Sequence, residues 1–196
     1  MARHPASKGD LIRARVVAPE QKFVALFLPF EFKVGALNYF YASMRLLESM
    51  QGVPADDRIV APALMLYRHS VELALKSVFQ RLHFDDGPVE SNPDLEKSIG
   101  KKYGHDLKKS FEDIEQLNSS QKVPEQIREK VRELVNLLSE EHIESVTLRY
   151  GSNSDNDFED AFPLVGLHGG LNQAWQNLYV FLDAVVDGEL KRVAAG

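Results

Sequence analysis

The clearest periodic pattern in the chain lies in residues 61–84, APALMLYRHSVELALKSVFQRLHF. Apolar residues recur there every three or four positions and form one stripe, about 80° wide, on a helix that turns about 100° per residue. The stripe consists of Leu64, Tyr67, Val71, Leu75, Val78 and Leu82. Because Leu66 and Leu73 lie on the opposite side, the pattern predicts a central helix from about Arg58 to about His83.

Similar spacing predicts four further helices. Their expected ranges are Ala36 to about Met50, His105 to about Leu117, Pro124 to Leu138, and about Gly170 to Val186. Residues 84–104 are polar and contain two prolines, so they are predicted to form a long surface loop with room for one helical turn. The stretch SVTLRY is predicted to be extended, and GSNSDNDFED to be an acidic loop.

The first 33 residues have no helical period. Residues 23–32, FVALFLPFEF, are apolar and β-prone, but Pro29 interrupts them, which suits an edge strand or an extended arm. The sequence therefore predicts an all-α protein: an up-and-down bundle of about five helices over residues 34–190, preceded by an irregular or β-prone N-terminal arm, residues 1–33.

Composition narrows the class of protein. Among 196 residues, 44% are hydrophobic and the net charge is −6, which fits a folded domain but not a protein that binds nucleic acid over its whole surface. The chain has no cysteine, which excludes disulfides and thiolate chemistry. No apolar run approaches the roughly 20 residues of a membrane helix, and the N-terminus lacks the apolar block of a secretory signal. We therefore expect a cytoplasmic protein without membrane contact.

Charged residues lie beside the apolar stripe of the central helix. Arg68 is about 40° from Leu64 on the projection, Glu72 lies one turn on, and Lys76 one turn further. One interpretation is an ion pair on a half-exposed helix shoulder, which stabilises a helix by a few tenths of a kcal/mol. The other is a polar wall that faces a cleft between helices and binds a ligand there. His69 is predicted to point away from this pair.

Two other features are candidates for a site. His105 precedes a predicted helix start, where it can cap the helix or belong to a site. Lys101, Lys102, Lys108 and Lys109 form a basic cluster that suits an RNA backbone, although such clusters are usually solvated faces. The acidic loop lacks the turn glycine and distal glutamate of a calcium loop, and no P-loop is present, so no metal or cofactor is predicted.

The segments YRHSVELALKSVF, YGHDLKKSFEDI and TLRYG, in this order, resemble the HEPN superfamily of small helical-bundle proteins. That family's pattern is a core helix RHxxELxLK, a helix that opens with HDL, and an FRYP-like segment before the last helix. The matching positions are Arg68, His69, Glu72, Leu73, Leu75 and Lys76, then Gly104, His105, Asp106 and Leu107, then Arg149 and Tyr150. The resemblance covers about residues 36–187.

The resemblance implies a bundle of four or five helices, often dimeric, in a prokaryotic toxin–antitoxin or anti-phage system. Many members are metal-independent ribonucleases in which a histidine follows an arginine after four to six residues. No arginine of this chain has a histidine at that spacing, and Gly151 replaces the proline of the FRYP-like segment. The expected function is therefore a non-catalytic module that binds a nucleotide, RNA or a partner protein, as a homodimer, with Arg68, Glu72, Lys76, His105, Arg149 and Tyr150 as ligand-binding residues. The alternative is a metal-independent ribonuclease that uses Arg68, His105 and Arg149.

Overall fold

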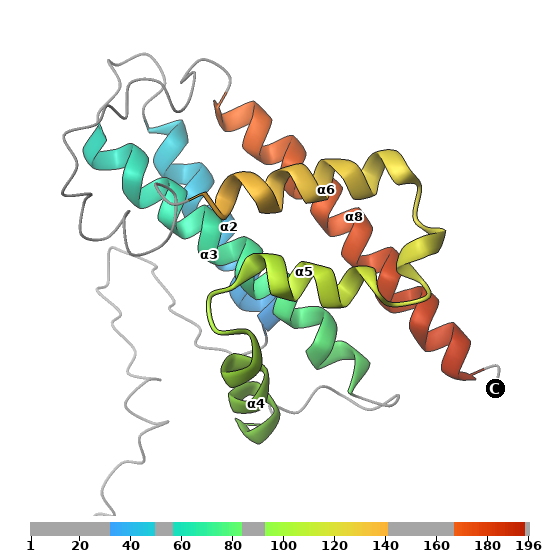
Figure 1. Ribbon diagram of the computed structural model, residues 1–196. Helices are drawn as coiled ribbons and strands as arrows, with labels where there is room; N and C mark the ends of the chain where they lie inside the picture. Colours follow the sequence, from blue (N-terminus) through green and yellow to red (C-terminus); the bar gives the residue numbers. More distant parts are fainter. Residues whose placement is uncertain (1–31, 50–56, 84–92, 141–166, 195–196) are drawn as a thin grey trace, which may run out of the picture.

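The computed structural model describes residues 32–49, 57–83, 93–140 and 167–194, and these residues are almost entirely helical (Figure 1). The described part contains six α-helices and one 3-10 turn. They are α2 (Phe32–Glu48), α3 (Asp57–Leu82), α4 (Pro93–Tyr103), α5 (Leu107–Glu115), η1 (Ser120–Lys122), α6 (Glu125–Leu138) and α8 (Leu167–Ala194). None of these helices offers a stretch both long and apolar enough to traverse a lipid bilayer.

Helix α3 lies at the centre and contacts α2, α4, α5 and α8. Helix α2 runs antiparallel to it: the backbone N–H of Phe32 donates to Gln80 Oε1 at 3.0 Å, and Ser43 Oγ donates to the carbonyl of Ala63 at 2.8 Å. The first bond joins the start of α2 to the end of α3, and the second joins the later part of α2 to the early part of α3. Together they fix the register of the two helices.

Helix α8 runs in the same direction as α3. The hydroxyl of Tyr67 donates to the carbonyl of Leu171 at 2.8 Å, and Arg81, four turns further along α3, pairs with Asp183 at 2.7 Å. Helices α5 and α6 cross over α3 and α8, while α4 projects from one end of the bundle (Figure 1).

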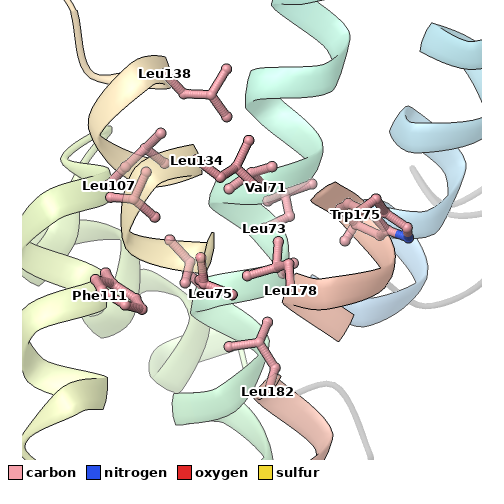
Figure 2. Packing of buried hydrophobic residues seen from close by; sticks show 14 of the residues in the cluster. Val71, Leu73, Leu75, Leu107, Phe111, Leu134, Leu138, Trp175, Leu178 and Leu182 are labelled. Carbon is pink, nitrogen blue, oxygen red and sulfur yellow. The ribbon is translucent and has the colours of Figure 1, made fainter. Parts of the chain in front are cut away.

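Part of the core lies where α5 and α6 pack against α3 and α8. Figure 2 shows Leu107 and Phe111 of α5 and Leu134 of α6 facing Val71 and Leu75 of α3. All five side chains are buried. The apolar stripe predicted for the central helix is therefore one core-facing side of α3. Leu73 on the opposite side is buried as well, as expected for a helix at the centre of the bundle.

The predicted all-α bundle is confirmed for the described residues, with three corrections. Helix α2 begins at Phe32, four residues before the predicted start and inside the predicted arm of residues 1–33. Residues 84–104 were expected to be a loop with one turn, but Pro93–Tyr103 form the three-turn helix α4, because Ile99 and Tyr103 bury their side chains against the bundle. The last helix runs from Leu167 to Ala194, so it begins three residues before Gly170 and ends eight residues after Val186, the predicted limits. The predictions for residues 1–31 and for SVTLRY and the acidic loop lie outside the described residues.

Candidate functional site: a buried carboxylate beneath an exposed histidine

Three charged side chains of α3 are buried. The side chains of Arg68, Glu72 and Lys76 are 5%, 4% and 7% exposed. The first interpretation of this row, an ion pair on a half-exposed shoulder, is therefore wrong. The row faces the interior between α3, the turn that joins α4 to α5, and the end of α6. Together with His69 and His105, these residues form what we call the Glu72 cluster.

Glu72 is the centre of the cluster, and both of its carboxylate oxygens are engaged. Lys76 Nζ donates to Oε1 at 2.7 Å, and His105 Nδ1 lies 3.0 Å from Oε2. The guanidinium of Arg68 lies 3.9 Å from the same Oε2. Burial by itself raises the pKa of Glu72, but the contacts from His69, Lys76 and His105 outweigh burial and lower the pKa from 4.5 to about 2. Glu72 is therefore ionised at neutral pH.

His69 was predicted to point away from the charged pair, and this prediction is wrong. Its Nδ1 lies 3.8 Å from Glu72 Oε2, and its ring meets the ring of Tyr39 edge-on with centroids 4.5 Å apart. His69 and Glu72 are three positions apart and therefore neighbours on the helix surface, although His69 lies further from Arg68 on the helix projection. The side chain of His69 is 30% exposed.

The cluster has two buried cations and one carboxylate, and main-chain carbonyls balance the second cation. Arg68 donates from Nε to the carbonyl of Leu138 at 3.1 Å and from an Nη to the carbonyl of His105 at 3.0 Å. Lys76 Nζ donates to the carbonyl of Gly104 at 2.5 Å. Leu138 is the last residue of α6, and Gly104 follows α4. Helix C-termini carry partial negative charge and carbonyls without intrahelical partners, so both cations stabilise helix ends.

The segment GHDL turns the chain from α4 into α5. Gly104 has φ +54°, the left-handed conformation typical of a residue that ends a helix, and its N–H donates to the carbonyl of Gly100 at 2.9 Å. Asp106 is the N-cap of α5 and accepts from the N–H of Lys109 at 2.9 Å. Because Asp106 performs the capping, His105 does not, and its ring reaches Glu72 instead.

His105 is the exposed member of the cluster. Its side chain is 65% exposed, although one ring nitrogen contacts a buried group. An ionised carboxylate can only accept hydrogen bonds, so the proton of a neutral His105 ring lies on Nδ1 and points at Glu72. The other nitrogen, Nε2, then carries a lone pair on the solvent-exposed edge of the ring. A buried carboxylate that orients an imidazole in this way fixes both its tautomer and its direction.

The turn around His105 is strongly basic. Residues 97–109 contain five lysines and one aspartate, in a chain whose net charge is −6. Lys102 pairs with Asp113 at 2.8 Å, and Lys109 Nζ donates to the carbonyl of Lys102. Lys101 and Lys108 are exposed, and within the described residues neither has an ion pair. Lys101 and Lys108 are therefore among the lysines of this segment that are exposed and without an acidic partner in the described residues, while Glu112, Asp113 and Glu115 of α5 balance part of the positive charge.

Of the predicted site residues, the structure brings together Arg68, Glu72, Lys76 and His105, while Arg149 and Tyr150 lie outside the described residues. Binding of a ligand by these residues stays a prediction. Arg68 and Lys76 reach main-chain carbonyls, which sequence patterns cannot show because the carbonyls of Gly104 and Leu138 carry no side-chain signal. Within the described ranges no group of three or more His, Asp or Glu residues is placed to hold a metal ion.

Comparisons with protein-family models, with curated proteins and with solved structures gave no match to this chain. The functional argument therefore rests on the chemistry of the Glu72 cluster and its basic surroundings.

Proposed function

We propose that this protein is a non-catalytic, HEPN-like binding module that holds a phosphate group of RNA or of a nucleotide at the surface around His105. The observation that carries the proposal is the exposed His105 ring, fixed at Nδ1 by the buried Glu72, in a turn with lysines on both sides of it in the sequence. A protonated ring donates from Nε2, and flanking ammonium groups add the charge that phosphate oxygens require. Following the resemblance, we place the protein in a prokaryotic defence or toxin–antitoxin system, as a cytoplasmic homodimer.

The position of Arg68 favours binding over catalysis. A ribonuclease needs a cation on the scissile phosphate, but the Arg68 guanidinium is 5% exposed and donates to two main-chain carbonyls. Lys76 is used in the same way. These cations stabilise the turn that presents His105, and the exposed lysines remain available for the ligand.

The test is binding of a fluorescently labelled single-stranded RNA, followed by anisotropy, with unlabelled nucleotides as competitors. We expect binding that weakens as salt rises, because neutralising phosphates releases counterions. His105→Gln should weaken binding by about tenfold, the equivalent of one lost charge-assisted hydrogen bond. Lys101→Gln with Lys108→Gln should reduce the salt dependence.

The matched control is His83→Gln, since His83 is also an exposed histidine with Nδ1 bound, in its case to the carbonyl of Phe79 at 2.7 Å. Binding by His83→Gln should equal that of the parent protein. The proposal is refuted if neither RNA nor a nucleotide binds, or if the two histidine variants behave alike. Binding of a partner protein in place of both ligands would also refute it.

A metal-independent ribonuclease remains the second candidate, and the contact between Glu72 and His105 favours it. A histidine oriented by a carboxylate is suited to accept a proton from a ribose hydroxyl. Cleavage of RNA in EDTA that His105→Ala abolishes and His83→Ala preserves would replace the binding proposal with this one. Circular dichroism of each variant establishes that it is folded.

A further inference from the structure

The chemistry of the Glu72 cluster reaches beyond reversible binding. We propose that His105 is a phosphoryl-acceptor site, whose Nε2 takes a phosphoryl group from a donor of the phosphoramidate or acyl-phosphate class. A histidine nucleophile needs an accessible lone pair, a fixed tautomer and a group that stabilises the charge formed on the ring. His105 has all three in the described structure, and the inference uses the same histidine as the proposed function without requiring reversible binding.

The lone pair and the tautomer follow from geometry. The ring is 65% exposed, while Nδ1 is held 3.0 Å from Glu72 Oε2. Because Nδ1 donates its proton to an acceptor-only group, the exposed nitrogen of the neutral ring is the unprotonated one. Glu72 itself cannot turn away, since Lys76 holds its other oxygen at 2.7 Å and the side chain is 4% exposed.

The transfer step balances without another reactant. The Nε2 lone pair forms a bond to phosphorus while the bond between phosphorus and the leaving group breaks, and the leaving group keeps that electron pair. With phosphoramidate the leaving group is ammonia, so no proton has to move. The ring retains its proton on Nδ1 and becomes positively charged, and the carboxylate of Glu72 stabilises that charge at 3.0 Å, as the acid of a catalytic triad stabilises an imidazolium.

The surroundings favour a phosphoryl group over an uncharged acyl group. The transferred group is a dianion, and five lysines lie in residues 97–109 against one aspartate. The turn also leads into the N-terminus of α5, where helix dipoles favour negative charge. An uncharged group would gain nothing from either feature.

Two other histidines provide internal comparisons. His83 is exposed and also donates from Nδ1, but to the neutral carbonyl of Phe79. His69 lies 3.8 Å from Glu72 Oε2 and is 30% exposed. Only His105, among these three, combines high exposure with close contact to the carboxylate. The difference between His105 and His83 therefore measures the combined effect of Glu72 and of the surroundings of His105, and replacing Glu72 isolates the part that Glu72 contributes.

The experiment treats the full chain with potassium phosphoramidate at neutral pH and follows each histidine by peptide mass spectrometry and ³¹P NMR. We expect His105 to react at Nε2 about tenfold faster than His83. This factor is smaller than the rate increase from a fully positioned catalytic group, because the inference assumes no pocket for the phosphoryl donor. Glu72→Gln should reduce the rate at His105 to that at His83. Equal rates at the two histidines in the parent protein would overturn the inference, and this comparison needs no variant to fold.

Two independent assays separate this inference from the proposed function. RNA anisotropy measures reversible binding, whereas mass spectrometry measures covalent labelling of His105. Slow labelling of His105 with intact RNA binding refutes the acceptor role alone. Fast labelling without RNA or nucleotide binding refutes the proposed function alone.

Discussion

Replacing Glu72 with glutamine tests whether the buried carboxylate holds the cluster together. The substitution keeps the shape of the side chain but removes its charge and replaces one of its two acceptor oxygens with an NH2 donor. Arg68 and Lys76, 5% and 7% exposed, are then left as two buried cations without a counter-charge. Removing one partner of a buried ion pair typically costs about 3–5 kcal/mol, because the remaining charge stays desolvated.

The pKa of Glu72 provides a second measure of the same quantity. Burial would raise the pKa, but contacts from His69, Lys76 and His105 lower it from 4.5 to about 2. This difference corresponds to about 3 kcal/mol of stability, contributed by the ionised form when the protein folds. Since the folded-state pKa is the lower one, the contribution is complete above about pH 4.5 and is lost as pH falls toward 2.

The assay is urea unfolding followed by circular dichroism at several pH values. Glu72→Gln should lower the free energy of unfolding by about 3 kcal/mol at pH 7, and this deficit should shrink by more than half near pH 3, where the parent carboxylate is largely protonated on unfolding. The control is Glu133→Gln on the exposed side of α6, for which we expect a change within about 0.5 kcal/mol. A deficit below about 1 kcal/mol, or one that does not depend on pH, would refute the reasoning.

Two glycines give further tests by thermal or urea unfolding. Gly104→Ala places a side chain at φ +54° and should lower the free energy of unfolding by about 1–2 kcal/mol. Gly100→Ala, inside α4 with open space for a Cβ, should be neutral or stabilising. Equal effects of the two substitutions would contradict the role of the left-handed turn. Gly188→Ala brings a Cβ within 2.6 Å of Ser119 Cβ and should lower the free energy of unfolding by about 1–3 kcal/mol. Gly169→Ala is the control, because its Cβ meets no atom within 4 Å. A Gly188 variant as stable as the parent protein would show that α8 and the turn before η1 can separate without cost.

Much of the fold could be predicted because helical periodicity is a local property. Leu64, Tyr67 and Val71 lie in the core as their spacing indicates, and α3 begins and ends within one residue of the predicted limits. Helix α4 was missed although Leu95, Ile99 and Tyr103 recur every four residues, because its other positions are mostly polar and two prolines in residues 84–104 indicated a loop. Its apolar residues pack against α3 and α5. Contacts with the rest of the bundle therefore stabilise this helix beyond what its own helix propensity provides.

The candidate site divides in the same way. The sequence singled out Arg68, Glu72, Lys76 and His105, because charges beside an apolar stripe and a histidine before a helix start are visible in one dimension. It could not show that Asp106 takes the capping position or that His69 turns toward Glu72. Those outcomes depend on side-chain rotamers and on which residues lie close together in the folded protein.

Apart from α4, the sequence by itself determined which of the described segments become helices and which face of each is apolar, because each depends on residues three or four positions apart. Only the tertiary structure decided what the buried charges contact. The carbonyls that receive Lys76 and Arg68 come from positions 28, 37 and 70 residues away. A carbonyl is present at every residue and marks no position in a sequence, so its availability at a helix end next to α3 arises only when the helices pack.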